Sequence, residues 1–396
     1  MSSILIFNAK VVTPQGVKEN GWILWRDGRI ADIGSMPAPA AQSCENWPAM
    51  EKIDARGGWV LPGFIDVHVH GGYGCDFMDA DAEGLDAITR FHAAHGTTAM
   101  LATTVTAPKN DIDGVLERVH RYMQGPMPYA RLAGVHLEGP FISAKWPGAQ
   151  NPAHIVPPQP AWLEEWVSAH PGVIRMQTLA PETDGALPYI AALRRHGIVA
   201  ACGHTDALYA QIEAAVEHGL SHAVHTFNAM RALHHREPGT VGAVLSDERI
   251  AAEVIADGHH VHPAAIRLLV RAKGADRVVL ITDAISAAGL GDGDYELGGL
   301  AVVVKGGVAR LADGSSLAGS TLTMIGALRF AVREVGVPIE DASRMASGNP
   351  ARAIGLYGET GSLEPGKLAD VLLLDADLNL QRVWVSGREV ALNIGG

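Results

Sequence analysis

The sequence has few cysteines, few charged residues and no long apolar run. Three cysteines in 396 residues (Cys44, Cys75 and Cys202) form no CxxC pair and are too few for a disulfide framework. No segment approaches the roughly 18 uninterrupted apolar residues of a membrane span, and the N-terminal stretch predicts a strand rather than a signal peptide. We therefore expect a cytoplasmic protein from a reducing compartment, without a membrane partner.

Basic residues are also scarce. The chain has 31 lysines and arginines against 43 acidic residues, a formal charge of -12, while hydrophobic residues make up 47%. This balance excludes a disordered chain and a general nucleic-acid binder. Any anionic ligand must therefore be held by a few local groups.

The two ends of the chain predict short strands. Residues 4–58 contain three strand-like stretches with turn signals, and residues 360–396 return to the same pattern. The Pro- and Ala-rich residues 36–41 predict an exposed loop between strands. We expect residues 1–58 and 360–396 to build one small β-sandwich domain.

The central part predicts an α/β fold. Eight apolar, β-branched runs alternate with helix-like segments such as residues 81–96 and 205–219, which is typical of a (β/α)8 TIM barrel over residues 59–359. Residues 289–317 break this rhythm and predict a β-hairpin insertion. The eight predicted strands cover residues 64–70, 97–105, 131–139, 173–182, 198–205, 222–228, 250–258 and 277–284.

Metal-ligating residue types stand late in the predicted barrel strands, where such barrels carry their reacting groups. They are His68, His70, Glu138, His204, His225 and Asp283. Any one of the histidines is more often a hydrogen-bonded core group, but six such residues at five strand ends favour a divalent metal site.

Most of the 18 histidines have ordinary explanations. We expect solvent-facing or capping roles for those on predicted helices: His92, His95, His120, His170, His196 and His218. The loops after the sixth and seventh strands hold His234, His235, His259 and His262, and their pattern leaves these four unassigned.

The motifs resemble those of the amidohydrolase superfamily and, within it, the N-acetylglucosamine-6-phosphate deacetylase family. The superfamily marks are LPGFIDVHVHG (61–71) and GKLADVLLLD (366–375). Family marks follow in order: VHLEGPF (135–141), GHT (203–205), HTFNAM (225–230), REPG (236–239), ADGHHV (256–261), TDA (282–284) and LAGSTLTM (317–324).

The resemblance implies deacetylation of an N-acetylated amino-sugar phosphate, and a role for each matched residue. It implies a core metal site of Glu138, His204 and His225, with Asp283 as the catalytic aspartate. Zn²⁺ is the expected ion, with Fe²⁺, Co²⁺ or Mn²⁺ as alternatives. It also implies a homodimer in which Arg236 reaches across the interface. The implied phosphate and sugar contacts are Asn228, Ala229, Arg236, His260 and Leu317.

Two positions vary among the relatives that the sequence resembles. His68 and His70 are retained here, whereas Gln150 stands where some members have a histidine that polarises the substrate carbonyl. Glutamine is no cationic donor. We therefore expect a second metal ion held by His68 and His70, with Glu138 bridging, to supply this polarisation.

Three rival functions remain open on the sequence. Deacetylation of the galactosamine epimer is compatible with every motif. A cyclic-amide hydrolase is disfavoured because residues 173–182 contain no lysine to be carboxylated. A metal-free scaffold relative is disfavoured because all the metal-ligand positions are retained.

Overall fold

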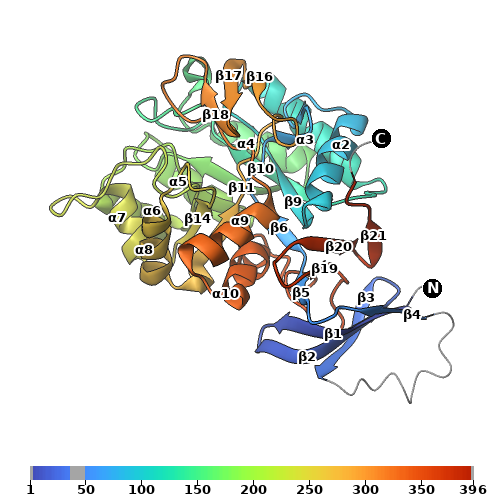
Figure 1. The fold of residues 1–396 in the computed structure, drawn as a ribbon. Helices are drawn as coiled ribbons and strands as arrows, with labels where there is room; N and C mark the ends of the chain where they lie inside the picture. Colours follow the sequence, from blue (N-terminus) through green and yellow to red (C-terminus); the bar gives the residue numbers. More distant parts are fainter. Residues whose placement is uncertain (1–2, 36–49, 394–396) are drawn as a thin grey trace.

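A computed structural model describes residues 3–35 and 50–393 of the chain (Figure 1). The predicted loop at residues 36–41 lies outside this range. Eight parallel strands form one sheet in the order β15-β14-β13-β12-β11-β10-β9-β6. Their bounds are β6 (Phe64–Asp66), β9 (Thr97–Thr103), β10 (Arg131–Glu138), β11 (Ile174–Leu179), β12 (Val199–Cys202), β13 (Leu220–Ala223), β14 (Ala251–Ile255) and β15 (Val278–Ile281).

The first and last strands of this sheet meet just beyond their ends. The backbone N–H of Asp283 donates to the carbonyl of His68 over 2.9 Å, and that of His70 donates to the carbonyl of Ala284 over 2.8 Å. The sheet therefore closes into the expected (β/α)8 TIM barrel. The residues after β6 and β15 are side by side in consequence.

Each connection between consecutive barrel strands carries one α-helix. Helix α2 illustrates why these segments form helices. The side chain of Asp81 caps its N-terminus by accepting from the N–H of Gly84, and its apolar side chains are buried. The connecting helices are α2 (Ala82–Ala94), α3 (Lys109–Met123), α4 (Pro160–Ala169), α5 (Ala186–Arg195), α6 (Tyr209–His218), α7 (Gly239–Ser246) and α8 (Pro263–Lys273). After β15 come α9 (Met324–Phe330), α10 (Ile339–Ser343) and α11 (Asn349–Ala353). None of the helices in the described ranges is long and apolar enough to cross a membrane.

Strands from both chain ends share one sheet, in the order β21-β20-β19-β5-β1-β2-β3, with β4 also paired to β1. The rings of Trp25 and Trp384, from opposite ends of the chain, pack edge to face with centroids 5.2 Å apart. The bounds are β1 (Ser3–Thr13), β2 (Gly16–Arg26), β3 (Arg29–Ser35), β4 (Met50–Asp54), β5 (Trp59–Pro62), β19 (Val371–Leu374), β20 (Leu380–Val385) and β21 (Arg388–Val390).

The terminal sheet reaches slightly further along the chain than the expected boundary at residue 58. Strand β5 pairs with β1 and β19, so four residues assigned to the barrel belong to this sheet. Its apolar sequence runs into that of β6, and only Gly63 separates the two. The assignment of residues to two independent domains otherwise stays a prediction.

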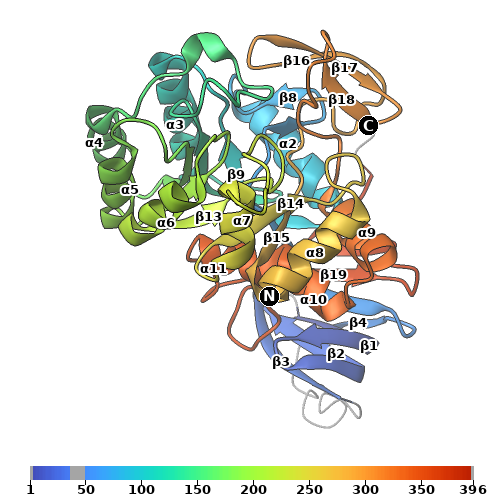
Figure 2. The ribbon, with the colours of Figure 1, turned by 90° about the vertical axis from the view of Figure 1, so that its left-hand side faces the viewer.

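The expected hairpin insertion is a three-stranded antiparallel sheet of β16 (Gly293–Leu297), β17 (Leu300–Lys305) and β18 (Val308–Leu311). Its apolar face packs on Val105 and Ile285, which follow barrel strands. Figures 1 and 2 show it at the opposite end of the molecule from β1–β4. The insertion therefore covers the barrel end where the candidate site lies.

Candidate metal and substrate site

Of the six metal-competent side chains, only Glu138 lies within a barrel strand, as the last residue of β10. The placement of His225 late in a strand is wrong, because β13 ends at Ala223. His204 and Asp283 likewise lie just beyond their strands. The backbone explains this, since these three residues adopt left-handed φ values of 48° (His204), 30° (His225) and 52° (Asp283), which no regular strand accommodates.

Glu138, His204 and His225 form a compact triangle of ligand atoms. Glu138 Oε1 lies 3.2 Å from His204 Nε2 and 3.1 Å from His225 Nε2, and the two nitrogens are 3.1 Å apart. Ligand atoms about 2.0–2.1 Å from a tetrahedral zinc ion are separated by roughly 3.3 Å. The triangle therefore has nearly the size that such an ion requires.

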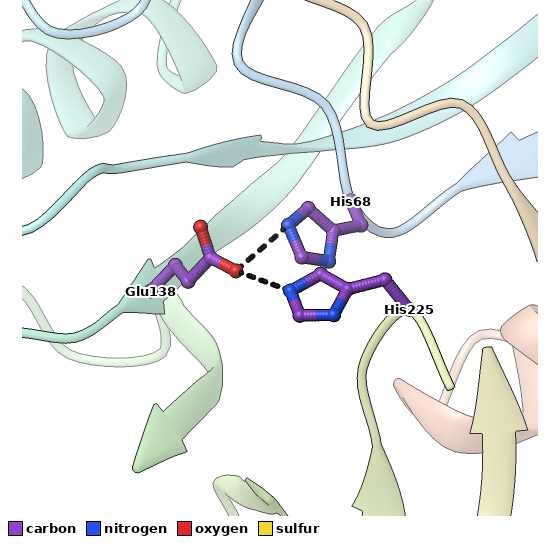
Figure 3. Close-up of side chains that lie close together, drawn as sticks. All are labelled: His68, Glu138 and His225. Carbon is purple, nitrogen blue, oxygen red and sulfur yellow. Dashed lines mark hydrogen bonds and ion pairs between the residues drawn. The ribbon is translucent and has the colours of Figure 1, made fainter. Parts of the chain in front are cut away.

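His68 and His70 approach the same carboxylate from the residues that follow β6. His68 Nε2 lies 3.3 Å from Glu138 Oε1, whereas His70 Nε2 lies 3.4 Å from Glu138 Oε2. Figure 3 shows His68 and His225 turned toward one oxygen of Glu138. Asp283 Oδ1 completes this half of the site, 3.1 Å from His70 Nε2 and 3.6 Å from His68 Nε2. The two oxygens of Glu138 thus face two overlapping groups of ligands.

The outer nitrogen of each ring has its own partner. Nδ1 contacts a backbone carbonyl in three of the histidines: Thr103 for His70, Trp146 for His204 and Asn228 for His225. A carbonyl only accepts hydrogen bonds, so each Nδ1 carries a proton, and in the neutral ring each Nε2 presents its lone pair to the centre of the site. This is the tautomer that binds a metal ion.

One buried atom and the pKa values of the site test whether a cation fits. His68 Nε2 is buried and has no hydrogen-bond partner among the described residues. Burial lowers the pKa of His70, but Asp283 and Glu138 outweigh it and raise this pKa to about 9. Burial also opposes ionisation of Glu138, yet its imidazole neighbours, His68 first, hold its pKa well below the usual range. The site is arranged to hold positive charge, whether protons or a divalent ion.

Five of the six metal-competent side chains line a cavity of about 170 Å³ (His70, Glu138, His204, His225 and Asp283), together with the predicted substrate contacts Asn228, Ala229, His260, Leu317 and Gln150. His260 Nδ1 contacts Asp257 Oδ2 over 2.7 Å. Arg236 is not among the lining residues; it is exposed and contacts His235. One chain therefore brings together every predicted site residue except Arg236; His68 does not line the cavity but lies against Glu138, which does.

Gln150 contacts two protein groups. Its Nε2 donates to Glu138 Oε2 over 2.5 Å, and its Oε1 accepts from the backbone N–H of Thr106 over 2.6 Å. The side chain is buried. It therefore orients the carboxylate at the centre of the metal-ligand cluster.

Sequence reasoning missed a buried layer behind the ligands. Glu253, inside β14, bonds His68 and His222, while His136 bonds the carbonyl of Val67 and the hydroxyl of Thr178. Glu253 and His136 interrupt apolar barrel strands, and that interruption was the available signal. A polar residue in an apolar strand indicates that the residue needs a buried partner, but the sequence does not identify that partner.

The remaining histidines are mostly ordinary, as expected. The expectation of a solvent-facing or capping role for His92 is wrong, because its ring is fully buried and Nε2 bonds the carbonyl of Gly71. Of the unassigned four, His262 caps α8 through Nδ1, and the others lie in surface loops.

A TIM barrel with histidines and carboxylates gathered just beyond its strand ends is the arrangement of a metal-dependent barrel enzyme. A model of the amidohydrolase family matches residues 59–390. The chain belongs to this metal-dependent family and, within it, to the N-acetylglucosamine-6-phosphate deacetylases.

Two relatives and one solved structure illustrate the match. N-acetylglucosamine-6-phosphate deacetylase of Vibrio furnissii is 44% identical over 84% of this chain and 82% of its own. N-acetylgalactosamine-6-phosphate deacetylase of Escherichia coli O157:H7 is 40% identical over 96% of this chain and 97% of its own. An aspartate-to-alanine mutant of the Mycobacterium smegmatis deacetylase, in complex with N-acetyl-D-glucosamine-6-phosphate, superposes with a TM-score of 0.92 at 38% identity, covering 98% of this chain and all of that one.

Proposed function

We propose that this chain hydrolyses the N-acetyl amide of N-acetyl-D-glucosamine 6-phosphate to acetate and D-glucosamine 6-phosphate. The observation that carries the proposal is the convergence of Glu138, His70, His204, His225 and Asp283 on one cavity that the family's sugar-contact positions also line. The test is acetate release by the purified protein, with and without a chelator.

Zn²⁺ is the proposed ion, since closely spaced imidazole nitrogen and carboxylate ligands suit it. Glu138, His204 and His225 would hold one ion, and His68 with His70 a second, Glu138 bridging the two. Fe²⁺, Co²⁺ and Mn²⁺ are alternative occupants. A bound divalent ion lowers the pKa of water toward about 7 and polarises an amide carbonyl. Elemental analysis of the active protein distinguishes one ion from two.

Asp283 is the proposed general base and acid. Burial opposes ionisation of Asp283, but the charges of His68 and His70 outweigh it and lower its pKa, so the carboxylate is available to accept a proton. It would take the proton of the attacking water and then deliver it to the departing sugar nitrogen. Asp283 Oδ1 lies 3.1 Å from His70 Nε2, which places the carboxylate beside the proposed metal ligands.

Arg236 and His260 are the proposed phosphate contacts. Arg236 is exposed, in a loop after β13, and does not line the cavity of its own chain. We therefore propose a homodimer in which this guanidinium reaches the partner's cavity, where its planar fork binds two phosphate oxygens.

The Arg236 proposal has a direct test. Arg236→Lys should raise KM for the phosphorylated sugar far more than for unphosphorylated N-acetylglucosamine, because lysine lacks the fork. Equal effects on both substrates would remove Arg236 from phosphate binding. Size-exclusion chromatography with light scattering tests the dimer.

N-acetylgalactosamine 6-phosphate is a second candidate substrate, favoured by the galactosamine-specific name of the Escherichia coli relative. Acetate release from both epimers under the same conditions separates the two candidates. We further propose that the protein acts in the cytoplasm on this small substrate, without a nucleic-acid or membrane partner.

A further inference from the structure

Glu253 lies behind the proposed metal ligands, out of reach of the cavity. It is the third residue of β14, its side chain is fully buried, and it does not line the cavity. Its Oε2 lies 2.9 Å from His68 Nδ1, and its Oε1 lies 2.9 Å from His222 Nε2. Each oxygen of one buried carboxylate therefore contacts one imidazole nitrogen.

An ionised carboxylate only accepts hydrogen bonds, so both facing nitrogens must carry their protons. The contact to Glu253 makes His68 an Nδ1–H donor, so that in the neutral ring the lone pair is on Nε2. The same role is played by backbone carbonyls for the other three histidines of the site. Only His68 is oriented by a charged group.

The lone pair of His68 Nε2 is aimed at oxygen atoms. Glu138 Oε1 lies 3.3 Å away and Asp283 Oδ1 lies 3.6 Å away, and the nitrogen has no hydrogen-bond partner among the described residues. Three electron-rich atoms around one point favour positive charge between them, which a bound divalent ion supplies when the ring is neutral.

We propose that Glu253 is a positioning residue that selects the metal-binding tautomer of His68, with His222 as the second donor that keeps the carboxylate ionised and in place. The inference rests on the metal site of the proposed function and adds a residue that does not itself touch an ion or the substrate. Groups behind a ligating histidine typically contribute 10–100-fold in metal affinity.

Glu253→Gln is the sharpest test, because it keeps the shape and removes the charge. An amide has one acceptor oxygen and one donor nitrogen, so it cannot accept from both rings. Where its NH₂ group faces His68, Nδ1 must become an acceptor and the proton moves to Nε2, which abolishes the ligand. We expect the ion bound by His68 to be held about 10–100-fold more weakly, in titrations of Zn²⁺ against a chelator of known affinity.

Two variants serve as controls. Asp370→Asn also neutralises a buried, hydrogen-bonded carboxylate, but one whose partners are Arg131, Thr360 and the backbone of Ser386. Its zinc affinity should equal that of the wild type. His222→Gln keeps a donor beside Glu253 and should weaken zinc less than Glu253→Gln does.

A measurement on the unmodified protein guards against a variant that fails to fold. In the zinc-loaded wild type labelled with ¹⁵N-histidine, His68 should show a proton on Nδ1 and a zinc-shifted Nε2, the assignment coming from loss of the signal in His68→Asn. A zinc-bound Nδ1 overturns the proposal, and so does wild-type zinc affinity in Glu253→Gln when the ¹⁵N spectrum of that variant shows no proton on His68 Nδ1. Neither readout uses substrate, so a failure of the deacetylase function alone would leave this result standing.

Discussion

At the scale of single residues, the site is built from backbone conformations that most side chains avoid. His204, His225 and Asp283 all have positive φ values, and such conformations cost about 1–3 kcal/mol each for a non-glycine residue. The bend at each residue turns its side chain from the end of the strand toward the cavity. The surrounding barrel supplies the stability that this arrangement requires.

Asp283→Asn tests the proton role without changing the size of the side chain. Asparagine cannot accept a proton from water, so we expect turnover to fall by about 10²–10⁴-fold, whereas zinc content should stay near that of the wild type. Acetate release and elemental analysis on the same preparation give both numbers. The matched control is Asp292→Asn, an exposed aspartate that bonds the backbone of Gly306 and Gly307. A near-normal rate for Asp283→Asn would exclude this residue as the base.

His92 should make stability depend on pH. Burial lowers its pKa to about 4, so in mild acid the unfolded chain takes up a proton that the folded chain does not. The free energy of unfolding should therefore fall as pH decreases from about 6.5 to about 4, by at most roughly 1.4 kcal/mol per pH unit. Above about pH 6.5 this residue contributes no pH dependence.

The comparison that isolates His92 is His92→Gln, which keeps a donor for the carbonyl of Gly71 but does not titrate. Urea midpoints at about pH 5 and pH 7 should differ less in this variant than in the wild type. The control is His218→Gln, since His218 is an exposed residue bonded to the carbonyl of Ala214. Equal pH dependence in His92→Gln and the wild type would contradict the assignment.

At the scale of secondary structure, the ligands depend on close contact between neighbouring strand ends. Gly203 follows β12, and a Cβ added there would lie 2.2 Å from Cγ2 of Val224, which follows β13. The glycine therefore lets the two backbone segments that contain His204 and His225 approach each other. The relative positions of His204 and His225 in the metal triangle therefore depend on this one small residue.

Gly203→Ala should destabilise the protein by about 1–3 kcal/mol through overpacking, and should weaken zinc binding because the strand ends are pushed apart. A thermal melt and a chelator titration measure the two effects. Gly358→Ala is the control, since a Cβ there meets open space. Unchanged zinc affinity in Gly203→Ala would mean that the loops absorb the shift.

At the scale of the whole molecule, the site joins distant parts of the chain. Glu138 alone contacts histidines from the ends of β6, β12 and β13. An ion held there links segments on several sides of the barrel. Its binding should therefore stabilise the entire fold rather than one loop.

Removal of metal should lower Tm, and readdition of Zn²⁺ should restore it, since a ligand that binds only the folded state at about 1,000 times its Kd adds roughly 4 kcal/mol. The Glu138→Gln variant should show a much smaller shift. Differential scanning calorimetry of chelated and zinc-loaded protein provides the measurement. Identical Tm values for the chelated and the zinc-loaded wild type would contradict the expectation that a bound ion stabilises the fold.

Much of the fold followed from local patterns. Seven of the eight barrel strands lie inside the predicted runs, and β13 begins two residues before its run. Apolar β-branched stretches bounded by helix signals have few alternatives to a buried strand. The limits of prediction appear where local patterns end. Strand β5 reads as part of the barrel from its composition, and its pairing with β1 and β19 depends on residues far away in the chain.

The sequence by itself determined the chemistry: histidines and carboxylates at strand ends, in motifs specific enough to identify the family. Only the tertiary structure decided how these groups face one another. It set the 3.1–3.2 Å triangle around Glu138, engaged both ends of Gln150, and placed Glu253 behind His68. The physical reason is that residue type follows from the chain locally, whereas the direction of a buried side chain depends on partners that only closure of the barrel brings into contact.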